Sequence, residues 1–211
     1  MEEVFHMAGV AEGRDETSLP RRLKRETTAV HRHLEAQLGL LDPGLDVHRY
    51  RRVLETFYGF YVPVEIEVAR LAAAEPLGFP LRARAKLIER DLLACGLAPA
   101  QLAALPLCSA RSELSCLEDL AGCLYVIEGA CLGGQVLAPL LYRRLGLTKD
   151  TGAAFFAGDE ESTLPRWTIV VAWLAGLPRT GASTARIIST AKGTFAALAR
   201  WAAFSREDGH G

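Results

Sequence analysis

The sequence predicts an all-α protein, and three observations support this fold class. Nearly every segment after residue 17 repeats its apolar residues at intervals of three and four, which is the period of a helix. No stretch sustains the alternation of apolar and polar residues that marks a half-buried strand. The chain has 211 residues, of which 50% are hydrophobic and 23% are charged, so it can bury a substantial core.

The first two helices are predicted from an apolar stripe and a capping residue. The stripe predicts a helix that ends at Gly39. Asp46 can cap the second helix, and Pro63 should kink or interrupt it, because proline lacks the backbone N–H that a helix interior uses. The residues of the first stripe are Leu23, Thr27, Val30, Leu34 and Leu38.

The later helices surround a long apolar segment over residues 112–145. Its most apolar part, residues 120–141, is long enough to span a bilayer, but Glu128 would then lie near the membrane midplane at a cost of roughly 2.5–3.5 kcal/mol or more. We therefore expect a core helix wrapped by other helices, and no membrane span. The other predicted helices lie at 81–95, just after Pro99, and near 150–157, 163–177 and 182–205.

We expect one domain over residues 18–206, with a loose N-terminal tail (1–17) and a C-terminal tail (207–211). The formal net charge of −1 argues against a nucleic-acid partner. Five cysteines without a CxxC pair, and an acidic start where a signal peptide would be basic, indicate a cytoplasmic protein with buried thiols.

His31 is the first residue that could carry chemistry. It lies roughly 60° from the centre of the first apolar stripe, whereas His33 lies roughly 100° away and should be more exposed. A neutral imidazole in this position is either a hydrogen-bonded core side chain or a metal ligand, and the residues alone favour the core side chain. The core helices offer no His pair at i, i+4 and no Glu-x-x-His. A metal on His31 would therefore need a porphyrin to supply its other four nitrogens, which points to haem.

The second feature is a glycine-rich stretch inside the apolar helix. Residues 128–135 read Glu-Gly-Ala-Cys-Leu-Gly-Gly-Gln, and two adjacent glycines in a helix interior cost about 1 kcal/mol each relative to alanine. They could permit close helix packing or a kink. They could equally form a bare face on which a planar ligand lies, and the residues alone leave both interpretations open. The residues of this bare face are Gly129, Ala130, Gly133 and Gly134.

Four motifs occur in order along the chain. Leu23-Lys24-x-x-Thr27-x-x-Val30-His31 comes first, and Tyr125-Val126-Ile127 followed by the glycine-rich stretch comes about a hundred residues later. Ala154-Phe155-Phe156 and Ala191-Lys192-Gly193-Thr194-Phe195 follow. Over about residues 18–205 the chain resembles the haem oxygenase (heme oxygenase) family, most closely the bacterial branch often found with bacteriophytochromes.

The resemblance implies a single-domain helical bundle whose kinked, glycine-rich distal helix lies over haem. In this resemblance, His31 matches the axial ligand of the haem iron, Lys24 a basic position near the haem propionates, and Phe195 an aromatic of the haem pocket. For the propionate-binding basic residue near the C-terminus, Arg166 is the best match, followed by Lys192 and Arg186.

The distal-helix positions of the family match Gly129, Gly133 and Gly134, with Ala130 among them as the expected catalytic segment. Ala130 departs from the family pattern, because most members have Asp at this position and the phytochrome-linked branch commonly has Ser. A methyl group cannot hydrogen-bond the pocket water that helps to deliver protons. Turnover should therefore be slow unless backbone groups and other waters suffice.

The function implied is oxidative cleavage of haem by O2 to biliverdin, carbon monoxide and Fe2+, with haem as both substrate and prosthetic group. The electrons would come from an external reductase or ferredoxin, since the chain has no flavin or iron–sulfur motif, and a bacteriophytochrome is the candidate receiver of biliverdin. Two alternatives remain open. One is a haem-binding carrier or sensor of the same fold with little turnover, and the other is an unrelated helical protein, such as a thiaminase-like enzyme, a partner-binding bundle or a membrane-associated protein.

Overall fold

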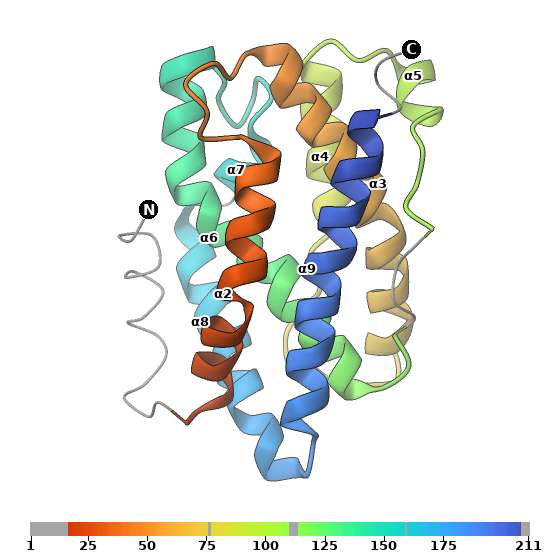
Figure 1. Cartoon of the computed structure of the whole chain (residues 1–211), viewed down its shortest axis with the longest axis vertical. Helices are drawn as coiled ribbons and strands as arrows, with labels where there is room; N and C mark the ends of the chain where they lie inside the picture. The colour runs from red at the N-terminus through yellow and green to blue at the C-terminus, as the bar shows by residue number, and fades with distance from the viewer. Residues whose placement is uncertain (1–16, 76, 110–113, 159, 208–211) are drawn as a thin grey trace.

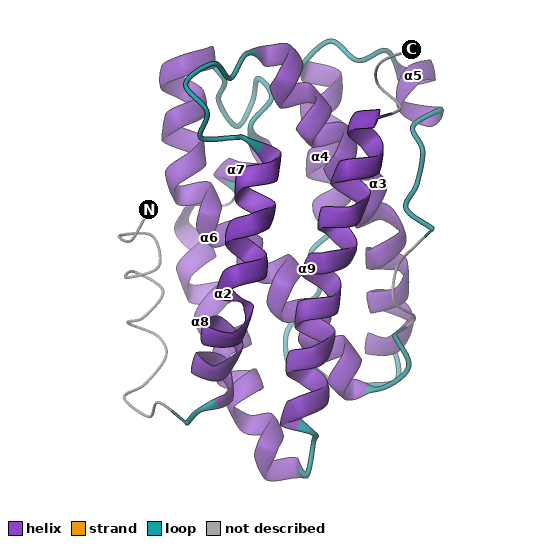
Figure 2. Cartoon of the chain, in the orientation of Figure 1, coloured by secondary structure: helices purple, strands orange, loops and turns teal. Residues whose placement is uncertain are grey.

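A computed structural model describes residues 17–75, 77–109, 114–158 and 160–207. Over these residues Figure 2 shows helices and loops and no strand, which confirms the all-α prediction. The predicted tails lie almost wholly outside the described residues, and the domain limits at 18 and 206 stay predictions.

The first two helices begin and end close to the predicted residues. Helix α2 covers Leu19–Leu38 and ends at Gly39, whose φ of +65° is easily reached only without a side chain and whose N–H donates to the Glu35 carbonyl at 3.1 Å. Helix α3 covers Val47–Ala72, and the Asp46 carboxylate caps it by accepting a backbone N–H at 2.7 Å.

Pro63 lies inside α3 without ending it, and the helix continues to Ala72. Proline has no N–H for the carbonyl four residues earlier, which belongs to Gly59. That carbonyl accepts instead from the backbone N–H of Cys108 at 2.9 Å. The segment that contains Pro106 and Cys108 can come this close to α3 because residue 59 is glycine. A Cβ on Gly59 would lie 2.6 Å from the Pro106 carbonyl oxygen. A tertiary hydrogen bond therefore replaces the helical one that Pro63 removes.

Helix α4 covers Arg84–Ala94 and begins three residues later than predicted. The reason is a contact from another helix. The Glu65 carboxylate of α3 accepts the backbone N–H groups of Arg84 and Ala85 at 2.7 and 3.1 Å, which satisfies two donors of the first turn. The short helix α5 follows over Pro99–Ala103, as predicted.

Helix α6 covers Leu117–Leu145 and is the central element. Figure 1 shows that α6 crosses behind α9 and α2 and that its second half then rises to the left of α2. By length and composition it could cross a membrane, but it packs against α3, α7, α8 and α9 as the core-helix prediction requires. Gly122 permits the close crossing with α9, since a Cβ there would collide with the Ile187 carbonyl oxygen.

The C-terminal part of the fold returns across α6 and α2. Helix α9 packs along both of them, and α7 packs against α4 and α6. The bounds are α7 Ala154–Ala157, α8 Glu160–Gly176, the 3-10 helix η2 Leu177–Thr180 and α9 Thr184–Glu207.

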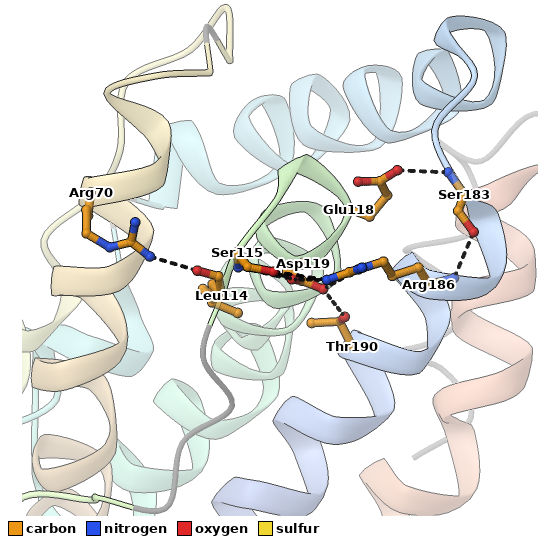
Figure 3. Close-up of polar contacts among 8 residues, drawn as sticks. All are labelled: Arg70, Leu114, Ser115, Glu118, Asp119, Ser183, Arg186 and Thr190. Atoms are coloured by element: carbon orange, nitrogen blue, oxygen red, sulfur yellow. Dashed lines mark hydrogen bonds and ion pairs between the residues drawn. The ribbon is translucent and has the colours of Figure 1, made fainter.

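A polar clamp centred on Asp119 ties the start of α6 to α9 (Figure 3). Arg186 donates to both oxygens of the Asp119 carboxylate, at 3.0 and 2.8 Å. Thr190 donates at 3.0 Å, and Ser115 donates through both its N–H and its hydroxyl at 3.0 Å. Arg186 is the main cause that holds the pKa of Asp119 well below its usual range. The carboxylate is buried, so these donors compensate for its lost hydration.

We predict that Asp119→Asn lowers the free energy of unfolding by about 2–3 kcal/mol at pH 7. Because the pKa of Asp119 is lower in the folded than in the unfolded protein, its carboxylate stabilises the fold above the unfolded pKa of about 3.9, and this contribution is lost as the pH falls below that value. The difference in unfolding free energy between Asp119→Asn and the parent should therefore shrink below about pH 4. Urea unfolding at pH 7 and pH 3 measures this difference. The control is Asp150→Asn, which breaks the exposed 2.8 Å pair with Arg90 and should cost less than about 1 kcal/mol. Equal losses in the two variants would contradict the role of the clamp.

Candidate functional site

A hollow lies between α2 and α6, and residues of α3, α7, α8 and α9 also line it. The empty space between its walls is ≈ 1470 Å³ when open solvent is counted, and the centres of water-sized spheres can reach ≈ 190 Å³ of it. Its wall is mainly aliphatic and aromatic, and its acidic and basic members are Lys24, His31 and Glu35. The hollow therefore suits a large apolar ligand that carries a few polar groups.

His31 faces this hollow from α2, and its side chain is 32% exposed. Its ring centroid lies 5.1 Å from that of Phe195 on α9, and its Nε2 lies 3.6 Å from Glu35 Oε1. Burial lowers the pKa of His31, although the nearby Glu35 charge opposes this effect. The neutral ring has a nitrogen lone pair for a metal. His33 is exposed, as the helical spacing predicted.

The glycine-rich part of α6 contributes Gly129, Ala130 and Gly133 to the wall of the hollow. No atom lies within 4 Å of the position that a Cβ of Gly133 would take, outside its own helix and chain neighbours. Gly134, the fourth residue of the predicted bare face, does not line the hollow. A Cβ on Gly134 would collide with the carbonyl oxygen of Phe156 in α7. The two adjacent glycines therefore serve different purposes, one leaving the hollow open and the other allowing α7 to approach.

Helix α7 is held in place by a buried carboxylate. Asp91 accepts the backbone N–H groups of Ala154 and Phe155, both at 2.7 Å, and the Tyr50 hydroxyl donates to the Gly152 carbonyl at 2.8 Å. Burial raises the pKa of Asp91 to about 6, against the effect of these hydrogen bonds. These hydrogen bonds hold Phe155 and Phe156 in the wall of the hollow.

Several aromatic residues of the wall were not predicted as site residues. Trp167 of α8 lies against Gly129, with its ring 3.5 Å from the position of a Gly129 Cβ and 5.8 Å from the Tyr125 ring centroid. Phe57 and Tyr61 of α3 contact the ring of Phe155 at centroid distances of 5.4 and 5.3 Å. Helical spacing puts Phe57 and Tyr61, four residues apart, on one face of α3, but it does not show that this face borders a cavity. Nothing in the local sequence of α8 pointed to Trp167.

The structure places Arg166 behind the wall of the hollow and not among its lining residues. Its side chain is 6% exposed and forms a bidentate pair with Glu128, with Nη2–Oε1 at 2.6 Å and Nε–Oε2 at 3.3 Å. The guanidinium also lies 4.6 Å from the centroid of the Phe79 ring. A buried guanidinium that neutralises a buried carboxylate is not free to meet a ligand.

Two of the other basic candidates are also engaged in ion pairs. Arg186 belongs to the Asp119 clamp. Lys192 pairs with Glu26 at 3.0 Å, which brings it to the part of α2 that also carries Lys24. Of the four basic candidates, only Lys24 lines the hollow. The structure therefore brings together Lys24, His31 and Phe195 with the small residues of α6.

This arrangement can hold a flat, mostly apolar group. A neutral imidazole on α2 can bind a metal at the centre of such a group, and the side-chain-free surface at Gly133 leaves room for its face. Lys24 can meet an anionic edge. Among the described residues, no cluster of three or more His, Cys, Asp or Glu side chains could hold a metal ion.

Comparisons with known proteins concern the family and the fold of the chain. The family model described as heme oxygenase matches residues 17–203. The comparison with curated proteins finds no match. Among solved structures, the chain is similar to heme oxygenase from Leptospira interrogans, with a TM-score of 0.72 and 21% sequence identity over 89% of this chain and 100% of that chain. At this identity the structural likeness concerns the fold.

Proposed function

The chain belongs to the heme oxygenase family, and on this premise we propose that its hollow binds haem with the iron on His31 and one face against Gly129, Ala130 and Gly133. The protein is an oxidoreductase that acts on haem with O2 and reducing electrons. The observation that carries the proposed site is the shared hollow, in which the half-buried, neutral imidazole of His31 and the small residues Gly129, Ala130 and Gly133 of α6 line the same apolar space.

Bound haem supplies the iron that activates O2 and the meso carbon that is oxidised. The residues of the chain provide the setting for this chemistry. His31 holds the iron from α2, and the aromatic wall excludes bulk water. The small residues of α6 leave space for O2 over one face and restrict the directions in which it can lie. We propose that the products are biliverdin, carbon monoxide and Fe2+.

For the haem propionates we propose Lys24 together with Lys192, in place of Arg166. Lys24 lines the hollow about two helical turns before His31. Glu26, two residues after Lys24 on α2, pairs with Lys192 at 3.0 Å, so the Lys192 ammonium lies near the same turn of α2 as Lys24. The Lys192 side chain is 43% exposed and can turn from Glu26 to a propionate. A charge-assisted hydrogen bond of this kind is worth about 1.5–3 kcal/mol when partly buried.

The rest of the proposed function concerns the setting of the enzyme. We propose a cytoplasmic protein that takes electrons from a reductase or ferredoxin and passes biliverdin to an acceptor such as a bacteriophytochrome. The support for this part is the resemblance of the glycine-rich stretch to the phytochrome-linked branch.

The test is a single-turnover experiment. The purified protein is loaded with one equivalent of haem, supplied with O2 and a ferredoxin with its reductase, and followed by absorbance. We expect the Soret band to give way to the red absorbance of biliverdin, with release of carbon monoxide. A haem spectrum that persists under these conditions would favour the carrier or sensor. An absence of haem binding would overturn the proposed site.

The methyl group at Ala130 leads to a separate prediction. Ala130→Ser places a hydroxyl in the wall of the hollow, where it can anchor a proton-delivering water. We expect the rate of biliverdin formation to be preserved or raised, by up to about tenfold if one hydrogen bond of ~1.4 kcal/mol is gained in the transition state. Ala138→Ser is the control, since Ala138 lies on α6 outside the hollow. A sharp fall in rate with unchanged haem affinity would show that the site requires the methyl group.

A further inference from the structure

Behind the wall of the hollow, a buried ion pair joins α6 to α8. The Glu128 and Arg166 side chains are 4% and 6% exposed and form two hydrogen bonds, at 2.6 and 3.3 Å. Removing one partner of such a pair leaves an uncompensated buried charge. Apolar side chains of similar volume usually stabilise a fold at least as well, so stability alone does not account for a buried ion pair.

The residues that follow the two partners form a second contact between the same helices. Gly129 comes after Glu128 and Trp167 comes after Arg166, and the Trp167 ring lies 3.5 Å from the position of a Gly129 Cβ. Gly129 and Trp167 both line the hollow, whereas Glu128 and Arg166 do not. The ion pair therefore fixes the register of the two wall residues from behind, because each partner is covalently adjacent to one of them.

The surroundings hold both charges in one geometry. The Arg166 guanidinium lies 4.6 Å from the centroid of the Phe79 ring, which restricts its plane. On the other side, Arg84 Nη2 lies 3.9 Å from Glu128 Oε2, and the Arg84 Nε and Nη2 atoms are buried without a hydrogen-bond partner. Glu128 thus lies between two guanidinium groups, and the hydrogen-bonded fork of Arg166 determines how the carboxylate is oriented.

We propose that Glu128 and Arg166 are positioning residues, which set the height and tilt of the segment from Gly129 to Gly133 over the ligand. The inference rests on the proposed haem site. The pair touches neither haem nor O2 and acts through Gly129 and Trp167. The planar guanidinium of Arg166 suits this role, because its two N–H donors fix the direction of the carboxylate as well as its distance. Displacement of a wall by a fraction of an ångström to an ångström changes the rate of a reaction that depends on orientation.

The test uses Arg166→Lys, which keeps the positive charge and removes the fork. The matched control is Arg186→Lys, the same change in the other bidentate pair between an α6 carboxylate and an arginine, in the Asp119 clamp away from the hollow. For each variant we would measure the dissociation constant for haem, kcat, and the C–O stretching frequency of the reduced carbon monoxide complex, which reports on the surroundings of a diatomic ligand without turnover.

We expect Arg166→Lys to bind haem within about threefold of the parent, to shift the C–O stretching frequency, and to lower kcat by about ten- to a hundredfold. Arg186→Lys should leave the frequency and kcat unchanged. Glu128→Asp, which keeps the charge and withdraws the carboxylate by one methylene, should repeat the Arg166→Lys result.

Three outcomes would overturn the inference. If Arg166→Lys and Arg186→Lys give the same frequency and kcat, the pair does not position the segment. If both Arg166→Lys and Glu128→Asp fail to fold, the pair serves the fold and not the site. A parent protein that binds no haem would overturn the proposed function as well, whereas the first two outcomes leave that function in place.

Discussion

Replacing His31 by alanine should abolish the imidazole-ligated spectrum of the haem complex and its turnover. The apolar wall of the hollow remains, so haem should still bind, but more weakly. Mutation of a residue that only hydrogen-bonds a metal ligand already lowers metal affinity or activity about 10–100-fold. Loss of the ligand itself should have a larger effect. Absorbance and electron paramagnetic resonance of the ferric complex measure the change of ligand.

Two further measurements separate ligation from a general loss of structure. Added imidazole should restore part of the spectrum and of the activity, since it can enter the space that the side chain leaves. His33→Ala is the matched control, because His33 is exposed on the same helix. An unchanged spectrum in the His31→Ala variant would show that another group binds the iron.

The second large effect concerns the two adjacent glycines of α6. Gly133→Leu should place a side chain in the open hollow, where no atom lies within 4 Å of the Cβ position outside its own helix and chain neighbours. We expect haem affinity to fall tenfold or more while the unfolding temperature stays near that of the parent. Haem titration and thermal unfolding of the ligand-free protein give the two quantities. Normal haem affinity in this variant would mean that haem lies elsewhere.

The same substitution at the two glycines should have opposite effects on stability. Gly133→Ala meets open space and should stabilise the helix by up to about 1 kcal/mol, the difference in helix propensity. Gly134→Ala pushes against the Phe156 carbonyl, a backbone group anchored through Asp91, and should destabilise by about 1–3 kcal/mol. Chemical denaturation of the ligand-free protein measures the free energy of unfolding of both variants. Equal effects at both positions would contradict the close packing of α7 on α6.

Much of the fold could be predicted because helix formation leaves local signals. The stripe from Leu23 to Leu38 and the stop at Gly39 correspond to α2, and Asp46 caps α3 as expected. These signals arise from backbone hydrogen bonds within a few residues, so they can be read without knowledge of neighbouring helices. The late start of α4 could not be predicted, because its first N–H groups bind Glu65, which lies on another helix.

The sequence by itself determined the helices, the central place of the apolar segment and the residue types of the site, together with the family that their order resembles. Only the tertiary structure decided which neighbour each of these residues meets. Gly133 and Gly134 are adjacent, yet a rotation of about 100° per residue turns one toward the hollow and the other toward α7. Arg166 looked like a residue for an anionic ligand edge until the fold placed Glu128, 38 residues earlier in the chain, against its guanidinium. Helical period specifies a direction around one axis, whereas packing of distant segments specifies what lies in that direction.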